Sequence, residues 1–592
     1  MNDTQVHEVL RRSPVFGVLP PPERAALVGQ LRVQRLPAGA RLFSEGDIGH
    51  SLYIVLEGQL RVSRTGGTND LLLYNVLGPG DVSGVAALLL EQARTADLVA
   101  LRDATVAELP LAGYEHLLRL NPLVFSRLFV QALQNHLRHF QPADEGQRAP
   151  TIAIVPLQPG PEAQMLARDL HLAFGAFGGC ALMEPSGDTS TDLDVAQAML
   201  RIDHHDRQSE VLLIRAEPAA NPWTRLALRQ ADHILFVATP GTSPLPGPLE
   251  RRLREEAGFD FKRQHLVVVY PEGSAHPSPT RPWRQDRPRL ERVLPLRRHH
   301  ADDLGRLARL LIGRAIGVVL GGGGARGLAS LGVMRALAEA GMPVDLLGGH
   351  SMGALIGSQW ALGHGLDAIA SRVVDLMTQP DRPTQPVVSL LSGRRMEQGL
   401  RRLCDHAQID GLWTPFFITA CNLSRAATTV LDHGPLWRAV LASNSPPGLL
   451  PPVLYDGDLL VDGAALDHVP VEAMRQRLSA PMERRRGHGT VIAIDVDVQE
   501  LPGSSSAPAQ VRGTPDGGQS MPGLGNILQL AGQVSGHLQK QKTAKLADFH
   551  LEPPVSDFAL NDYQRSSEII ERGYNHAVQA IANWDVRPPA RR

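Results

Sequence analysis

The sequence predicts a multidomain α/β protein, with an N-terminal β-roll and flanking helices, a middle parallel α/β domain, and a C-terminal three-layer α/β/α domain. The chain has 592 residues, several times the roughly 150 residues of a typical domain. Residues 12–140 alternate apolar and polar side chains between glycine turns, as short antiparallel strands do. After residue 151, strand-like runs alternate with helical runs, which favours parallel sheets with crossover helices.

Composition excludes several classes of protein. Hydrophobic residues are 43% of the chain and charged residues 20%, enough apolar surface for several cores. Lys+Arg is 59 and Asp+Glu is 61, a net charge of −2, so no nucleic-acid partner is expected. The three cysteines, Cys180, Cys404 and Cys421, are few and far apart, which argues against a disulfide framework and for a reducing, cytoplasmic setting. There is no signal peptide, and no run approaches the roughly 18 uncharged apolar residues of a membrane span.

The β-roll is expected over residues 12–140. SLYIVLEGQLRVSR alternates about a glycine turn at Gly58, LLLYNVLGPGD ends in a Gly-Pro-Gly turn, and TADLVALRDATVAELP reads as another strand pair. The segment from Tyr114 to Phe140 has apolar residues at helical spacing. A loose joint, QPADEGQRAP, follows it.

The middle domain is expected over residues 151–275. TIAIVPL, SEVLLIRAEP, HILFVAT and HLVVVYPEG are strand-like and are separated by helical runs, the pattern of a Rossmann-like parallel sheet. The first strand is followed by QPGPEA, which lacks the glycine-lysine pattern of a P-loop. The sequence therefore predicts no phosphate cradle in this domain.

Residues 276–313 are expected to be an arginine-rich connector. Within 281–314, ten arginines face four acids, a local charge of +6. The first interpretation is a solvated linker with a helical end, and the second is a contact with anionic lipid headgroups. The last domain then covers 314–592, with a mobile loop at 501–524 that is rich in Pro, Gly and Ser.

A nucleophile elbow is predicted at Ser351. Gly349-His350-Ser351-Met352-Gly353 fits G-x-S-x-G and lies between the strand VDLLGG and the helix MGALIGSQWAL. Such an elbow holds its serine on a strained strand-to-helix turn and needs small flanking residues, here Gly349 and Gly353. The alternative is a tight glycine turn in which Ser351 caps the helix.

A glycine-rich loop precedes the elbow. Gly321, Gly322, Gly323 and Gly324, followed by Arg326, occupy another strand-to-helix turn. Successive N–H groups at a helix start predict an oxyanion hole. Residues 322–327 also fit the G-x-G-x-x-G of a dinucleotide site, but Asp345 begins the next strand, whereas the acid of that site should end it. Arg326 is expected to orient the loop or meet a phosphate, and the alternative is a surface arginine beside a helix start.

The serine needs a base. Asp462 ends a strand in LLVDGAALDHVP and is followed by glycine, so its carboxylate can face the elbow. Asp467 is a second carboxylate, and His468 and His350 are the histidine alternatives. The side chain of His350 is expected to point away from the serine hydroxyl on such a turn.

GGGGARG, GHSMG and VDGA, in this order, resemble a patatin-like phospholipase domain. The resemblance implies a Ser-Asp dyad without a histidine base, with Ser351 as nucleophile, Asp462 as base, and Gly321 to Gly324 with Arg326 as the oxyanion loop. RLARLLIGRAIGVVLGGGGARG, PWTRLALRQADHILFV and LASNSPPGLLPP are similar to the neuropathy target esterase branch, over roughly residues 15–590. By that resemblance the substrate is a lysophospholipid or phospholipid acyl ester.

FSEGDIGHSLYIVLEGQLRV resembles a cyclic-nucleotide-binding β-roll. The phosphate cassette departs from the family pattern. Gly84 and the phosphate-binding Arg94 are present, but Val85 replaces the ribose-binding glutamate and Asp97, which could pair with Arg94, replaces a small hydroxyl residue. Valine cannot accept a ribose hydrogen bond, and an unpaired group costs about 1–3 kcal/mol. Cyclic-nucleotide binding is therefore expected to be absent or weak.

The sequence thus predicts a serine esterase that needs no cofactor and no metal, with a peripheral membrane contact left open. Three other classes are weighed against it. They are a regulatory protein with a degenerate hydrolase domain, an α/β-hydrolase-type esterase using His468, and a cyclic-nucleotide-responsive transcription factor. The complete serine, aspartate and glycine set disfavours the first, and the parallel-sheet units after residue 140 disfavour the last.

Overall fold

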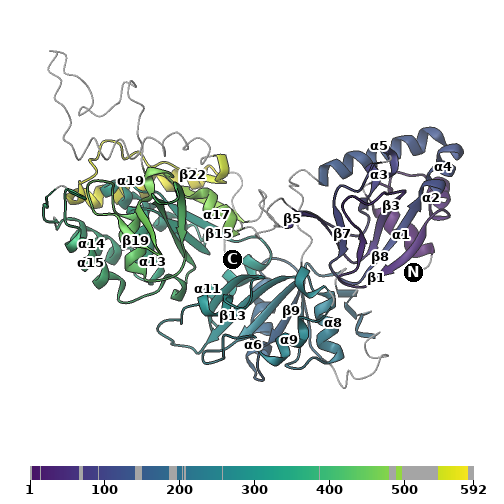
Figure 1. The fold of residues 1–592 in the computed structure, drawn as a ribbon, viewed down its shortest axis with the longest axis horizontal. Coiled ribbons are helices and arrows are strands. Elements are labelled where there is room, and N and C mark those ends of the chain that lie inside the picture. Colours follow the sequence, from purple (N-terminus) through teal and green to yellow (C-terminus); the bar gives the residue numbers. More distant parts are fainter. Residues whose placement is uncertain are drawn as a thin grey trace, which may run out of the picture. The chain divides into compact units, whose positions relative to one another are not determined.

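The fold of the chain is given by a computed structural model (Figure 1). The structure describes residues 3–584, except 14, 66–70, 91, 140–149, 186–196, 200, 203, 206–207, 257, 380, 386, 479–488 and 497–544. The loop predicted at 501–524 therefore lies outside the described residues. Two compact units are present, one formed mainly by residues 1–269 with 286–293 and one by 270–285 and 294–592 without 480–487, and each is described by itself.

The N-terminal part of the first unit is a β-roll. Its two antiparallel sheets have the orders β1-β8-β3-β6 and β2-β7-β4-β5. Gly58 makes the turn after β3 with a φ of 79°, and a Cβ there would lie 2.4 Å from a backbone oxygen. The elements are α1 (Asp3–Arg12), α2 (Pro21–Val28), β1 (Arg32–Leu36), β2 (Arg41–Phe43), β3 (Ser51–Glu57), β4 (Leu60–Thr65), β5 (Leu71–Leu77), β6 (Val82–Ser83), α3 (Val85–Leu90), β7 (Asp97–Ala100), β8 (Ala104–Pro110), α4 (Leu111–Leu120) and α5 (Pro122–His139).

A six-stranded sheet follows, in the order β10-β11-β9-β12-β13-β14. β9 is buried along its whole length and pairs in parallel with β11 and β12, as its continuous apolar run predicts. The elements are β9 (Thr151–Pro156), α6 (Glu162–Phe174), β10 (Cys180–Met183), β11 (Val211–Arg215), α8 (Pro222–Gln230), β12 (His233–Ala238), α9 (Pro248–Leu253), η1 (Phe259–Phe261), β13 (Arg263–Tyr270) and β14 (Leu290–Arg297).

The predicted connector at 276–313 contains regular structure. Residues 290–297 form β14, and residues 301–311 form a helix, α11. Several of its arginines have buried acidic partners elsewhere in the same unit: Arg287 pairs with Glu250, and Arg309 with Asp345 at 2.6 Å. The expected helical end is present as α11, but the solvated-linker interpretation is wrong for β14 and for the paired arginines. A local charge count cannot include partners supplied by distant residues.

The second unit is built on a mixed eight-stranded sheet. Its order is β19-β20-β17-β16-β15-β21-β22, and β18 pairs with β17. The elements are α10 (Arg281–Arg284), α11 (Ala301–Leu311), β15 (Ile316–Leu320), η2 (Gly324–Leu328), α12 (Ala329–Glu339), β16 (Leu346–Gly349), α13 (Met352–Ala361), α14 (Leu366–Met377), α15 (Arg394–Cys404), η3 (Ile409–Gly411), β17 (Phe416–Asn422), β18 (Ala427–Leu431), α16 (Leu436–Ser443), β19 (Val453–Tyr455), β20 (Asp458–Asp462), η4 (Gly463–Ala465), α17 (Val471–Leu478), β21 (Thr490–Ile494), β22 (Phe549–Leu551), η5 (Tyr563–Arg565) and α19 (Ser566–Ala582).

Helices cover both faces of this sheet. Ile316, Val318 and Leu320 on β15 belong to one core cluster with α12, α13, α14 and α19. Gly317 faces the other way, and a Cβ there would lie 2.4 Å from the sulfur of Met474 on α17. Alternate residues of one strand therefore pack against different helical layers. The glycine-rich loop follows β15, the serine motif follows β16, and Asp462 ends β20.

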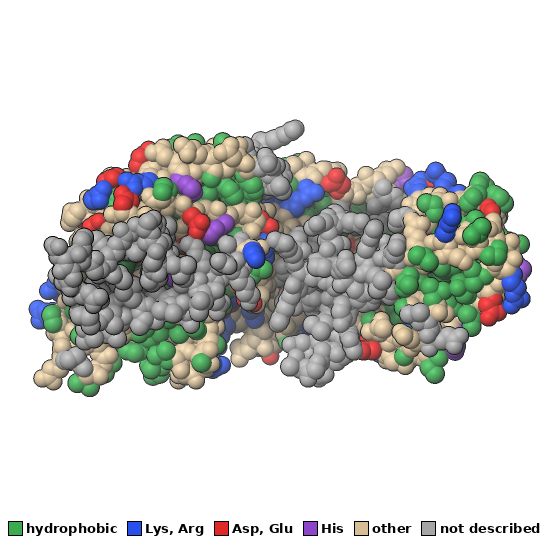
Figure 2. All heavy atoms as spheres, turned by 90° about the horizontal axis from the view of Figure 1, so that it is seen from above, with side chains coloured by type: hydrophobic (Ala, Val, Ile, Leu, Met, Phe, Trp, Pro, Cys, Tyr) green, Lys and Arg blue, Asp and Glu red, His purple; other side chains and the backbone are tan. Residues whose placement is uncertain are grey.

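None of the helices in the described part of the chain has the length and apolarity that crossing a bilayer requires. On the face seen in Figure 2, basic, acidic and hydrophobic side chains are interspersed in small groups. This distribution agrees with the nearly balanced charge of the sequence.

Candidate active site

Ser351 stands at the turn between β16 and α13. Its backbone angles are φ 50° and ψ −126°, in a region that non-glycine residues rarely adopt. A Cβ atom on Gly349 would lie 2.8 Å from the backbone of Gly353, and one on Gly353 would lie 2.2 Å from the oxygen of Leu320. The turn is therefore strained at the serine and leaves no space for side chains on the two glycines.

The hydroxyl of Ser351 donates a hydrogen bond to Asp462, with 2.8 Å between Oγ and Oδ2. Asp462 is buried at the end of β20, and its Oδ1 accepts the N–H of Ala464 at 3.0 Å. The adjacent Gly463 has no room for a side chain, because a Cβ there would lie 2.9 Å from the Cβ of His350. These contacts orient the carboxylate toward the serine.

A polar segment after α16 holds the nucleophile in place, and sequence reasoning assigned it no role. Ser443 Oγ accepts the N–H of Ser351 at 2.8 Å, and the amide of Asn444 donates to the carbonyl of Ser351 at 2.8 Å. The carbonyl of Ser445 accepts the N–H of Asp462 at 2.9 Å. The only signal was the polar Ser-Asn-Ser run between a helix and two prolines.

The glycine-rich loop lies against the elbow, because a Cβ on Gly322 would lie 2.8 Å from the Cβ of Ser351. Gly321 donates to a carbonyl of β21 at 2.9 Å, and Gly322 donates to Nε2 of His350 at 3.1 Å. Within the described part of the chain, the N–H groups of Gly323 and Gly324 have no hydrogen-bond acceptor. Their φ values of 150° and 55° lie in the region that favours glycine. The oxyanion role of the loop stays a prediction, and these two N–H groups are its candidate donors.

Arg326 donates from its guanidinium to a distant segment of the same unit, which agrees with the expectation that it orients the glycine-rich loop. Its Nε and Nη2 donate to the carbonyls of Phe558 and Ser556, at 2.8 and 3.1 Å. The next contact along the loop is similar, because Ala325 donates its N–H to the carbonyl of Leu560 at 2.8 Å. Arg326 fastens the glycine-rich loop to the segment after β22.

His350 is buried and contacts the other two motifs. Its Nε2 faces the N–H of Gly322 and also the carbonyl of His468, while Nδ1 lies 3.9 Å from Oδ1 of Asp462. Burial disfavours the imidazolium, but the neighbouring Asp462, the His468 carbonyl and Asp467 outweigh it and raise the pKa of His350 above its ordinary value. The ring lies on the Asp462 side of the site, and the Ser351 hydroxyl donates to Asp462 instead.

His468 enters the site through its backbone carbonyl. Its side chain is buried, and the hydroxyl of Ser351 has Asp462 as its acceptor. This arrangement disfavours the α/β-hydrolase-type alternative that uses His468 as base.

Asp345, the acid considered for a dinucleotide site, has a structural role. Asp345 is 1% exposed, pairs with Arg309 at 2.6 Å and accepts the N–H of Ile316 at 2.9 Å. It ties α11 to β15 and does not face the glycine-rich loop as a ribose ligand would.

Among the described residues, one group of side chains could hold a metal ion. Asp495, His550 and Glu552 each offer a ligand atom within 4.8 Å of the others, at the ends of β21 and β22. Nε2 of His550 lies 3.7 Å from Oδ2 of Asp495, so two of these three side chains already contact each other. The Ser351–Asp462 contact does not involve this group.

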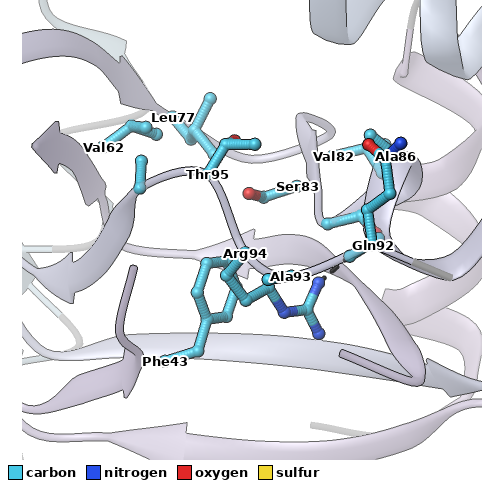
Figure 3. A pocket seen from close by; sticks show the side chains of 13 residues that line it. Phe43, Val62, Leu77, Val82, Ser83, Ala86, Gln92, Ala93, Arg94 and Thr95 are labelled. Carbon is cyan, nitrogen blue, oxygen red and sulfur yellow. Dashed lines mark hydrogen bonds between the residues drawn. The ribbon is translucent and has the colours of Figure 1, made fainter. Parts of the chain in front are cut away.

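The β-roll contains a small pocket that is open to solvent (Figure 3). Phe43 and Arg94 lie side by side on one wall, and Val62, Leu77 and Thr95 lie on another. No carboxylate is present among the described residues that line it. Within the described lining, no acid stands in for the ribose acceptor that the sequence lacks.

The guanidinium of Arg94 is held by the protein itself. It donates to the carbonyls of Ser51 at 2.8 Å and Gly84 at 3.3 Å and lies over the ring of Phe43 at 4.3 Å. Burial lowers the pKa of Arg94. The pairing with Asp97 that the sequence suggested is wrong, because that carboxylate accepts the N–H of Glu45.

Three stretches match family models. They are the cyclic nucleotide-binding domain at 33–121, the neuropathy target esterase family P-loop like domain at 149–292, and the patatin-like phospholipase at 318–475. The chain is a patatin-domain protein of the neuropathy target esterase type. The patatin match spans the glycine-rich loop, the elbow and Asp462. The absence of a phosphate cradle in the middle domain stays a prediction.

Curated relatives align with most of this patatin-domain chain. Human patatin-like phospholipase domain-containing protein 6 is 30% identical over 92% of this chain and 44% of its own length. Lysophospholipase NTE1 of Mycosarcoma maydis is 28% identical over 95% of this chain and 34% of its own. The chain therefore spans less than half the length of these relatives. A solved N-terminal domain of a Streptomyces coelicolor transcriptional regulator matches 22% of the chain, with 31% identity and a TM-score of 0.20.

Proposed function

We propose that the protein is a serine esterase that hydrolyses the acyl ester bonds of lysophospholipids or phospholipids. The observation that carries the proposal is the 2.8 Å hydrogen bond from Ser351 to Asp462, formed on a strained elbow beside two unengaged glycine N–H groups. A serine hydroxyl with an adjacent base and oxyanion donors is the arrangement of acyl transfer. The lipid substrate class rests on the similarity to patatin-like phospholipases and a lysophospholipase.

The acylation step uses the dyad. Asp462 takes the proton of Ser351 as Oγ attacks the ester carbonyl carbon. The tetrahedral intermediate then collapses, the bond from carbon to the glycerol oxygen breaks, and the proton passes from Asp462 to the leaving alkoxide. An acyl-enzyme on Ser351 results.

The N–H groups of Gly323 and Gly324 stabilise the oxyanion of that intermediate. They are fixed by the loop before the substrate arrives, so little reorganisation is needed. Deacylation repeats the chemistry with water. Asp462 takes a proton from water, hydroxide attacks the acyl carbon, and the fatty acid leaves as Ser351 recovers its proton.

The roll is proposed as a regulatory or dimerising module, with cyclic-nucleotide binding absent or weak. Two observations support this: the protein's own carbonyls engage Arg94, and the described residues that line the pocket include no carboxylate. Calorimetric titration with cyclic AMP should give no binding in the micromolar range or tighter, and such binding would overturn this part of the proposal.

The deciding experiment measures fatty-acid release from lysophosphatidylcholine by the wild type and by Ser351→Ala, together with fluorophosphonate labelling. Release and labelling should both vanish in the variant while its circular dichroism spectrum is unchanged. Labelling without release would replace lysophospholipids by other acyl esters. If a folded wild type shows neither labelling nor fatty-acid release, the alternative of a regulatory protein with a degenerate hydrolase domain is favoured.

A further inference from the structure

An exposed apolar loop joins α14 to α15 in the hydrolase unit. Val387 and Val388 at its tip are 86% and 65% exposed. The base of the loop is fastened, because Asp381 accepts the N–H groups of Arg395 and Met396 at 3.0 and 3.2 Å. We call residues 381–393 the valine loop. Its base is anchored while its two valines project into solvent.

The valine loop is anchored beside the segment that holds the nucleophile. The N–H groups of Leu390 and Leu391 donate to the carbonyls of Gly448 and Leu449, at 2.9 and 3.0 Å. These two acceptors lie in an apolar run, residues 446–453, in which every residue is partly exposed. The run begins immediately after the Asn-Ser pair that bonds to the backbone of the catalytic residues, so apolar surface extends from the nucleophile to the valine loop.

The same apolar surface continues across the edge of the sheet. Leu454 on β19 is directly opposite Leu459 on β20, and Leu423, just after β17, donates its N–H to the carbonyl of Leu459 at 2.9 Å. Residues directly opposite each other point to the same face. The exposed fractions of Leu454, Leu459 and Leu423 are 58%, 38% and 50%. Three neighbouring leucines therefore expose apolar surface at this edge of the sheet.

The helix that follows the valine loop is strongly basic. Residues 381–402 contain five arginines and two acids, a net charge of +3, and no lysine. Four of the arginines lie in the first and last turns of α15 and are exposed: Arg394, Arg395, Arg401 and Arg402. Guanidinium groups bind phosphate oxygens in pairs. Arg401 is already paired with Glu397 at 2.8 Å, so Arg394 and Arg402 are the cations best suited to anionic headgroups.

We propose that the valine loop and the arginines of α15 dock the hydrolase unit on the surface of a bilayer containing anionic phospholipids. Val387 and Val388 insert between the headgroups, and the arginines bind lipid phosphates. Residues 446–453 then face the lipid and offer an apolar path for an acyl chain toward Ser351. The choice of a bilayer over a protein partner rests on the combination of apolar tip, basic helix and continuity with the nucleophile, and it builds on the proposed lipid esterase function.

The test measures co-sedimentation of the full chain with vesicles. Phosphatidylcholine vesicles are compared with vesicles in which about one quarter of the lipid is phosphatidylglycerol, and Ser351→Ala is used as the background so that nothing is hydrolysed. Val387→Asp/Val388→Asp should weaken vesicle binding at least about tenfold, because two inserted apolar side chains become charged. Arg394→Gln/Arg402→Gln should remove the preference for phosphatidylglycerol.

Matched controls separate this proposal from the proposed function. Val578→Asp alters a valine on α19 that is 42% exposed, and should leave vesicle binding unchanged. With Ser351 restored, the valine-loop variant should hydrolyse a soluble short-chain ester within about twofold of the wild type and lose activity on vesicles. Undiminished vesicle binding by the valine-loop variant would overturn the proposal. A smaller oligomer in the variant than in the wild type would also overturn it, because it would mark the loop as a protein interface. Vesicle binding with no esterase activity would reject the function and keep the docking surface.

Discussion

Nε2 of His350 lies 3.1 Å from the backbone nitrogen of Gly322, and the same atom contacts the carbonyl of His468. The two backbone groups need opposite partners, because the N–H requires an acceptor and the carbonyl requires a donor. Imidazole protonated at Nδ1 satisfies Gly322, whereas protonation at Nε2 satisfies His468. The protonation state of His350 therefore decides whether the N–H of Gly322 is engaged or left available beside Gly323.

Replacing His350 tests whether it positions the glycine-rich loop. His350→Gln keeps a donor and an acceptor, and should retain activity within about tenfold of the wild type. His350→Phe leaves buried backbone groups unpaired at about 1–3 kcal/mol each, and should lower kcat by about 10²-fold with a smaller change in KM. Steady-state kinetics on a soluble ester measure both. Equal activity of the two variants would assign His350 a purely space-filling role.

Asp462→Asn should reduce fluorophosphonate labelling and ester turnover by about 10²–10⁴-fold, because an amide cannot take the serine proton. Asparagine retains an oxygen for the N–H of Ala464, so the melting temperature should change little. Asp456→Asn, in the turn after β19, is the matched control and should behave as wild type. A labelling rate preserved in Asp462→Asn would point to a different base.

Gly353→Ala should disrupt the elbow. The new Cβ would lie 2.2 Å from a backbone oxygen of β15, and relieving such a clash costs about 1–3 kcal/mol or more. Differential scanning fluorimetry should show a lower unfolding midpoint, with labelling of Ser351 abolished. Gly365→Ala is the control, since no atom lies within 4 Å of its added Cβ. Similar midpoints for the two variants would contradict the steric account.

Arg326→Lys tests the fastening of the loop to residues 556–560. A single ammonium cannot reproduce the two guanidinium hydrogen bonds, so kcat should fall about tenfold while the charge is kept. Arg335→Lys, which alters an exposed arginine paired with Glu571, should have no effect. A wild-type kcat in Arg326→Lys would limit the role of Arg326 to stability.

Stability in the first unit should depend on pH through Lys262. Its ammonium contacts the carbonyls of Leu101, Arg229 and Ala231, and burial lowers its pKa from 10.5 to about 7. Between these values the unfolded chain binds more protons than the folded one, so the free energy of unfolding rises with pH across that window. Thermal unfolding from pH 7 to 10 should show this rise, and Lys262→Met should flatten it. An equal slope in the variant would assign the rise to other groups.

Local patterns were enough to place Ser351 and Asp462 at strand ends. The glycines beside each residue indicate a tight turn, and this signal lies within a few residues of sequence. Local patterns were not enough for Arg326, whose partners Phe558 and Ser556 are 232 and 230 residues away. Local patterns also failed to predict β14. Charged residues at 291 and 292 interrupt its apolar run, and the strand forms by pairing with a sheet made of distant segments. Contacts between distant segments leave little trace in a single sequence.

The hydrogen bonds from Arg326 to the carbonyls of Ser556 and Phe558 have a consequence for synthesis on the ribosome. The elbow and Asp462 emerge long before the segment that fastens the glycine-rich loop. A nascent chain can therefore carry both members of the dyad while its oxyanion donors are still unanchored. The proposed esterase activity should therefore appear late in translation. An incomplete chain would then not hydrolyse the lipids of nearby membranes.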